Sequence, residues 1–194
     1  MIEHIVHGIK SVGGIQWLFF VLIFISVFLF QQKIDKEMKG LKRIGNALFF
    51  AYCYLLLYGT LFSRNVGIPF RFDFHIWKIV WDFIKGVFAT QLEMVSNIIY
   101  FIPVGFFLSL MAQNGREASM EQCMKVCRKG AVFSMGIELL QCVTGRGLLE
   151  LMDILCNSLG TFSGYILFTI GIYLKRMFWN FIRYYTVSYT HLTL

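Results

Sequence analysis

The sequence predicts an all-α integral membrane helical bundle, with about five transmembrane helices and one further helix at the outer interface. Two observations lead to this prediction. The 194-residue chain is 57% hydrophobic and only 15% charged, whereas a soluble domain carries about 25% charged residues. The charged residues also gather in short clusters, and the apolar runs between them approach the ~20 residues that cross a bilayer. We therefore expect one helical domain embedded in a membrane.

Each expected span is an apolar run bounded by polar residues. The first run is just long enough to cross, and no small-residue cleavage pattern follows it, which argues against a signal peptide. The fourth run is too short alone, but a face of Met and Cys lets its helix begin near Ala118. The expected spans are residues 14–30, 44–62, 94–112, 118–143 and 153–174.

Basic residues predict how these spans are oriented. Residues 31–43, 113–129 and 175–185 hold 12 of the 18 Lys and Arg residues, and basic loops stay on the cytoplasmic side. This places the N-terminus outside and the C-terminus in the cytoplasm. The same loops account for the net charge of +7, so we do not expect nucleic acid as a partner.

Two segments outside the spans have helical patterns. Residues 74–88 combine Trp and Phe with polar residues at helical spacing, which is typical of a helix in the headgroup region; a re-entrant segment is the competing interpretation. Residues 175–185 resemble an interfacial tail helix. The final residues, 187–194, continue no pattern, and we expect them to lie outside the functional fold.

We expect three parts along the chain. Residues 1–45 form the first span and a basic loop, residues 46–174 the main membrane domain, and residues 175–194 a cytoplasmic tail. In the last span, Gly160 and Gly164 form a G-x-x-x-G step that Gly171 extends by one heptad. Such a face allows another helix to approach closely, within the chain or between chains. The oligomeric state therefore stays open.

Polar residues from four segments reach one level under this topology, at the outer edge of the membrane. Glu138 lies ~7–8 Å below the outer end of its span, by the rise of an α-helix. Capping or snorkelling explains most such residues singly, but a carboxylate within an apolar run is a candidate functional residue. The cluster comprises Arg64, Asn97, Glu138, Gln141, Arg146, Glu150, Asp153 and Asn157.

Cysteine and histidine give no sign of a metal or disulfide framework. The chain has five cysteines, an odd number without paired spacing. Cys123 and Cys127 share a helix face with methionines, which favours core packing. We predict no cofactor and no resident metal, although a divalent ion held by Glu138, Asp153 and Asn157 is an open alternative.

Four stretches, spread over roughly residues 46–170, contain the polar residues of the cluster. They are YLLLYGTLFSR, ending at Arg64; SNIIYFIPVGFFLSL, with Asn97; SMGIELLQ, with Glu138 and Gln141; and GRGLLELMDILCNSLGTFSGY, with the remaining polar residues. In this order they resemble the VanZ-like membrane proteins. Two positions depart from the pattern: Glu150, where relatives often have Asp, and Leu149, where many have Phe. The resemblance implies a bacterial plasma-membrane protein of the cell envelope, in a family named after a member associated with teicoplanin resistance.

Three functions remain to be compared. The first is binding of a membrane lipid or lipid-linked wall precursor at the outer leaflet, with Arg64, Asn97, Gln141, Arg146, Glu150 and Asn157 as ligand-binding residues. The second is a membrane-embedded enzyme in which Glu138 and Asp153 are the catalytic acid or base. The third is transport, which is least favoured because the inner halves of the spans are nearly free of polar groups.

Overall fold

The computed structural model describes residues 14–34, 40–62, 67, 72–73, 75–112 and 119–190. Nearly all of them are helical, which confirms the prediction of an all-α bundle. The elements are α2 (Gly14–Ile34), α3 (Gly40–Leu57), a π-helical turn η1 (Tyr58–Phe62), β1 (Phe72–Asp73), α4 (Ile76–Ile84), α5 (Phe88–Ala112), α6 (Met120–Val143), β2 (Leu149–Glu150) and α7 (Leu151–Thr190).

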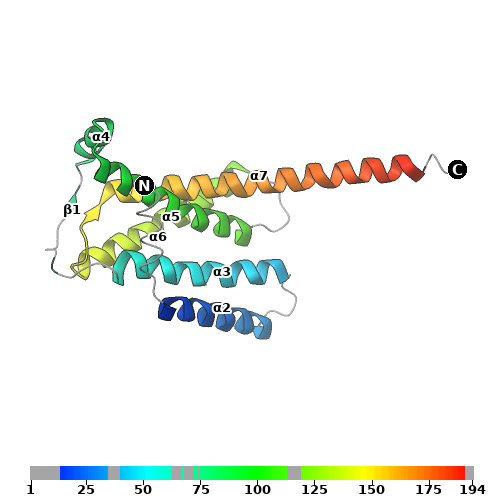
Figure 1. Cartoon of the computed structure of the whole chain (residues 1–194), viewed down its shortest axis with the longest axis horizontal. Coiled ribbons are helices and arrows are strands. Elements are labelled where there is room, and N and C mark those ends of the chain that lie inside the picture. Colours follow the sequence, from blue (N-terminus) through cyan, green and yellow to red (C-terminus); the bar gives the residue numbers. More distant parts are fainter. Residues whose placement is uncertain are drawn as a thin grey trace.

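The long helices run roughly side by side, and α4 lies at one end of the bundle (Figure 1). The closest packing is between α5 and α7, and α6 contacts both of them. On the other side, α3 packs against α5, and α2 packs against α3. The C-terminal part of α7 projects beyond the other helices (Figure 1), and its side chains from Tyr173 to Tyr184 are exposed.

Glycines bring α5 and α7 together. A Cβ atom added at Gly160 would collide with the backbone oxygen of Ile98, and one at Gly164 would collide with that of Ile102. The close approach predicted for the G-x-x-x-G step is therefore confirmed, and its partner is a helix of the same chain. The extension of this face to Gly171 was wrong: a Cβ there would meet nothing within 4 Å among the described residues.

Among the described residues, three helices are long and apolar enough to cross a membrane. They are Lys42–Leu61, Phe88–Ala112 and Leu151–Tyr184, while Trp17–Gln32 is a shorter apolar helix. Helix α6 is not among them because even its last 18 residues carry three charged side chains, Arg128, Lys129 and Glu138. The prediction that α2 and α6 also cross therefore stays a prediction.

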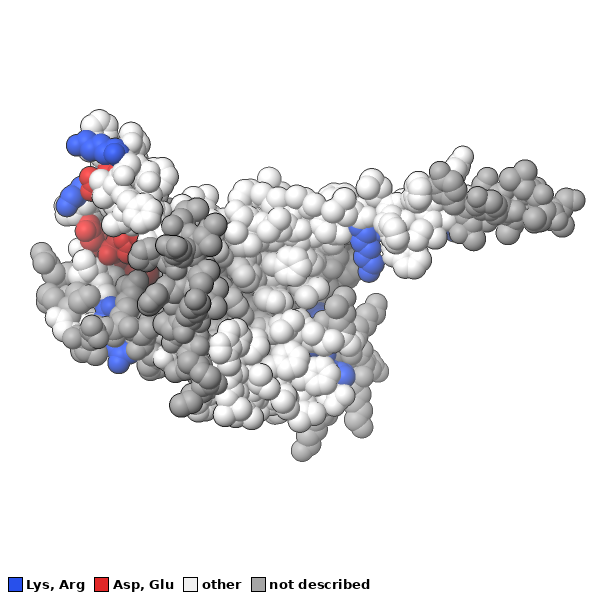
Figure 2. Space-filling model, in the orientation of Figure 1, with Lys and Arg blue, Asp and Glu red and all other residues white. Residues whose placement is uncertain are grey.

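The charged side chains on the surface lie at the two ends of the bundle. In the view of Figure 2, charged side chains gather at the α4 end of the bundle and at the opposite end, and the described surface between them is uncharged. At the end opposite α4, the charged side chains visible in this view are basic. An uncharged belt between two polar ends is what a bilayer requires.

Several expected boundaries differ from the observed ones. The expected interfacial helix of residues 74–88 is shorter, and α5 already begins at Phe88 after a turn in which Gly86 has a φ of 77°. Helix α6 begins at Met120, two residues after the expected start. Its N-cap is Ser119, whose hydroxyl oxygen accepts a hydrogen bond from the backbone N–H of Gln122.

The expectation of a separate tail helix was wrong. Helix α7 continues without interruption from Leu151 to Thr190, and no Gly or Pro occurs after Gly171 to end it. Residues 187–190 thus belong to this helix, and residues 191–194 lie outside the described residues.

Candidate functional site: a polar cavity between four helical segments

Glu138 and Gln141 lie on the face of α6 that points into the bundle. They are 3% and 2% exposed, although α6 has exposed residues on its other faces. The side-chain amide of Gln141 donates through Nε2 to the backbone oxygen of Thr60, at 3.2 Å. Oε2 of Glu138 accepts a hydrogen bond from the backbone N–H of Glu150, at 3.3 Å. The two side chains therefore connect α6 to η1 and to β2.

Asp153 and Asn157 are one turn apart on α7, and both are buried, with exposures of 7% and 4%. Nδ2 of Asn157 donates to Oγ of Ser134 on α6, at 2.8 Å. Ser134 is 0% exposed and precedes Glu138 by one turn, so both lie on the inner face of α6. This polar contact joins α6 to α7 in the interior of the bundle.

Five of the predicted site residues line one small cavity. Asn97 reaches it from α5, Glu138 and Gln141 from α6, and Asp153 and Asn157 from α7. The space open to the centre of a water-sized sphere is ≈ 10 Å³, which is room for about one water molecule. The rest of the lining is mostly apolar and comprises Leu56, Thr60, Tyr100, Phe101 and Ile137.

Three amide atoms at this cavity are buried without a hydrogen-bond partner among the described residues. Two are acceptors, Oε1 of Gln141 and Oδ1 of Asn157, and the third is a donor, Nδ2 of Asn97. A buried polar atom that stays unpaired costs about 1–3 kcal/mol. Three such atoms at one cavity are costly for simple packing, and they are the feature expected of a site that binds something.

Arg146 and Glu150 lie beside the cavity, outside its lining. Nη1 of Arg146 donates to the backbone oxygen of Leu61 at 2.9 Å, which ties the α6–α7 turn to the end of η1. Glu150 belongs to β2 and contributes its backbone N–H to Glu138. Arg64 lies outside the described residues, so its position relative to these groups stays a prediction.

A short backbone pairing holds the connection before α4 against this corner. Strand β1 pairs in parallel with β2, with Phe72 opposite Leu149 and Asp73 opposite Glu150. The backbone N–H of Gly67 also donates to the backbone oxygen of Gly145, at 2.9 Å. Glu150 of β2 also donates its backbone N–H to Glu138 at the cavity. Strand β1, which precedes α4, is therefore connected to the polar cavity through β2.

The sequence did not point to Thr60, Tyr100 or Ser134 as parts of this site. Thr60 lies near the end of an expected span, where Thr is common, and Tyr100 lies within an apolar run, where a Tyr does not stand out. For Ser134 a signal existed, since it lies four residues before Glu138 on the same face.

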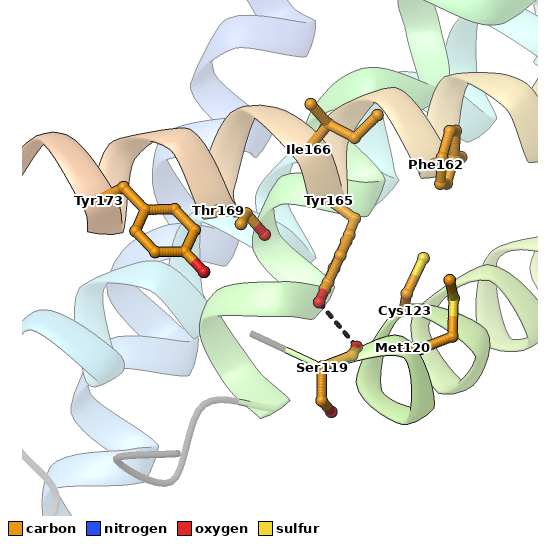
Figure 3. Close-up of a pocket in the computed structure, with 8 residues that line it drawn as sticks. All are labelled: Ser119, Met120, Cys123, Phe162, Tyr165, Ile166, Thr169 and Tyr173. Carbon is orange, nitrogen blue, oxygen red and sulfur yellow. Dashed lines mark hydrogen bonds between the residues drawn. The ribbon is translucent and has the colours of Figure 1, made fainter. Parts of the chain in front are cut away.

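A second, larger groove lies between α7 and the start of α6, and Figure 3 shows its side chains. Its volume, counted in the same way, is ≈ 270 Å³. The hydroxyl of Tyr165 donates to the backbone oxygen of Ser119 across it, at 2.9 Å. The remaining lining residues are Met120, Cys123, Phe162, Ile166, Thr169 and Tyr173.

The predicted core role of the cysteines on α6 is confirmed. Cys123 forms a buried cluster with Val126 and Tyr165, and Cys127 packs against it. Within the described residues, no group of three or more His, Cys, Asp or Glu side chains is placed to hold a metal ion.

The fold and the cavity define a helical membrane protein with a polar site buried at one end of an apolar bundle. The profile of the family described as VanZ/LLP1 matches residues 16–174, and the chain belongs to this VanZ family. The matched range includes α2, which precedes the stretches that carry the resemblance in sequence. No curated protein and no solved structure matches the chain.

Proposed function

We propose that this chain binds a membrane amphiphile, such as a lipid or a lipid-linked wall precursor, through the polar cavity of Glu138, Gln141, Asp153, Asn157 and Asn97. The observation that supports it is the set of unpaired amide atoms at a buried cavity in an apolar bundle. A purely structural core avoids such atoms because each is costly to bury. A ligand's polar group would pair with them.

The proposal includes an orientation in a bacterial plasma membrane. The cavity lies near the α6–α7 turn, and the basic residues 125–129 lie at the opposite end of α6. By the positive-inside tendency, the cavity end then faces outward, with the N-terminus outside and the C-terminus in the cytoplasm. The ligand would enter from the outer leaflet.

Helix α4 suits the lipid-facing part of this role. Trp77 is 85% exposed and Trp81 57% exposed, and Nζ of Lys85 lies 5.4 Å from the ring centroid of Trp81. Tryptophan beside lysine is typical of the headgroup region of a bilayer. Because α4 contacts both α5 and α7, it would hold the ligand's apolar part near the cavity.

A second candidate function is catalysis on such a ligand. It is favoured by one observation, that two acidic residues, Glu138 and Asp153, line the same small cavity. Two carboxyl groups at one site can divide the roles of general acid and general base. Reduced susceptibility to teicoplanin would be a cellular consequence of either function.

A lipid analysis of membranes with and without the protein tests the proposal and separates its two forms. A lipid or precursor that co-purifies with the protein, in membranes of unchanged lipid composition, supports binding. A new lipid species that disappears in the double variant Glu138→Gln and Asp153→Asn supports catalysis. Absence of any co-purifying lipid, with an unchanged lipid profile, would contradict both.

A further inference from the structure

The size of the polar cavity restricts what can enter it. Its ≈ 10 Å³ admits a group of about one water molecule's size. A phosphate group or a trimethylammonium group has several heavy atoms around its centre and does not fit. A single ion, or the terminal –NH₃⁺ of a longer molecule, does fit.

The chemistry of the side chains that line the cavity restricts the kind of ligand further. Its polar side chains are rich in oxygen acceptors: the carboxylates of Glu138 and Asp153, and the amide oxygens of Gln141 and Asn157. Among the described residues that line the cavity, none is basic. Carboxylate and amide oxygens are the ligands of hard cations, and Glu138 and Asp153 can add carboxylate oxygens to the two unpaired amide oxygens.

The two amide oxygens provide an independent sign of a ligand. Oε1 of Gln141 and Oδ1 of Asn157 have no hydrogen-bond partner among the described residues, and their side chains are 2% and 4% exposed. The amide nitrogens of the same side chains are both engaged, with Thr60 and with Ser134. The carbonyl of Thr60 can only accept, so its bond fixes which way the Gln141 amide faces. In the structure the bond from Nδ2 of Asn157 to Ser134 likewise leaves Oδ1 of Asn157 without a partner, and both residues line the cavity.

We infer that this cavity is a binding site for one small cation, held by Glu138, Gln141, Asp153 and Asn157. The cation is either an inorganic ion or the primary ammonium of an amphiphile's head group, which share the same recognition chemistry. A half-turn of the Asn97 amide would exchange its unpaired nitrogen for an oxygen and add a further ligand. The ammonium form rests on the proposed function, whereas the inorganic form stands without it.

The test measures thermal unfolding of the full chain in detergent. NaCl, MgCl₂ and CaCl₂ are compared with choline chloride at equal ionic strength, because choline is too large for the cavity. In parallel, the chain is placed in bilayers of phosphatidylethanolamine or phosphatidylcholine. A cation at 100 times its Kd would raise the Tm by about 5–11 °C. A rise with an inorganic salt identifies an ion, and a rise with the ethanolamine lipid identifies an ammonium head group.

Two variants and a control assign the effect to the cavity. Glu138→Gln keeps the shape, removes the charge, and is expected to abolish the rise. Glu121→Gln removes an exposed carboxylate from the same helix and should keep it. If Glu138→Gln does not fold, Asn157→Asp replaces that test. This variant adds a carboxylate at the cavity, and the hydroxyl of Ser134 can still donate a hydrogen bond to it. The rise in Tm with divalent ions should then be larger than in the wild type.

The inference is overturned if every salt and lipid gives the same Tm as its choline counterpart, which is the behaviour of a cavity that holds only water. It is equally overturned if Asn157→Asp leaves the responses unchanged. A lipid that co-purifies without any preference for ammonium would end the inference, and would leave of the proposed function only the binding of an amphiphile whose head group stays outside the cavity. Stabilisation by an inorganic ion, with no bound lipid, would support the cation site and contradict the proposed function.

Discussion

Asn157 donates a hydrogen bond from Nδ2 to Oγ of Ser134, at 2.8 Å, between two helices and out of contact with solvent. The same side chain keeps its Oδ1 without a partner at the cavity. One half of this amide thus has a structural role, and the other half is unpaired on a residue that lines the cavity. Substitutions at Asn157 should therefore affect both the stability of the bundle and the binding of a ligand.

Replacing Asn157 by Ala should destabilise the bundle by about 1–3 kcal/mol, because the buried hydroxyl of Ser134 loses its partner. The measurement is thermal unfolding in detergent. The matched control is Asn180→Ala, on the exposed part of the same helix, which should change the Tm little. Equal effects of the two substitutions would contradict the assigned contact.

Adding a methyl group at Gly164 should be costly, because its Cβ would collide with the backbone of α5. We expect Gly164→Ala to cost about 1–3 kcal/mol, as overpacking does. Gly171→Ala on the same helix meets open space and should be neutral or slightly stabilising, since Ala favours a helix more than Gly does. Equilibrium unfolding of both variants compares them, and a tolerated Ala at Gly164 would contradict the packing of α5 on α7.

The orientation of the chain predicts which side a label can reach. In a chain whose native cysteines are replaced, Thr144→Cys on the α6–α7 turn should react with an impermeant thiol reagent added outside intact cells. Lys125→Cys, near the other end of α6, should react only after the membrane is opened. Both positions are exposed in the structure. The opposite pattern would place the polar cavity at the cytoplasmic side.

The start of α4 should depend on pH through Asp73. Its Oδ1 accepts hydrogen bonds from the backbone N–H of His75 and from the His75 ring, each at 2.8 Å, and these bonds hold the pKa of Asp73 below its ordinary value of 3.8. A lowered pKa means that this contribution is complete above pH 3.8 and is lost as the pH falls below that value. Hydrogen exchange at the first amides of α4 should rise in acid.

Asp73→Asn should remove this acid dependence, because the variant has no carboxylate to titrate. Asp82→Asn, within α4 itself, is the control and should keep it. If the acid response is the same in both variants, the bond between Asp73 and His75 does not hold the start of the helix.

Polarity and helical spacing were sufficient to predict the centre of the site. Glu138 and Gln141 stand out because they interrupt an apolar run, and their spacing and that of Asp153 and Asn157 put each pair on one face. The glycines that pack α7 against α5 were also visible. These features depend only on residue type and helical spacing, so they can be predicted from the sequence.

Other parts depend on tertiary structure that no local pattern reveals. The pairing of β1 with β2 involves two residues on each side, too few to show an alternating pattern. Thr60 joins the site only because η1 packs against α6, and Ser134 joins it because α6 packs against α7. The uninterrupted length of α7 was missed because basic residues 175–176 looked like the end of a membrane helix, yet charge does not stop a helix as Pro or Gly does.

The central claim is that the buried polar cavity binds a membrane amphiphile. Native mass spectrometry of the chain purified in mild detergent tests it most directly, comparing the wild type with Glu138→Gln and with the surface control Glu121→Gln. We predict a bound lipid or lipid-linked species in the wild type and the control, and its loss in Glu138→Gln while the variant remains folded. Equal lipid occupancy in all three proteins would contradict the claim.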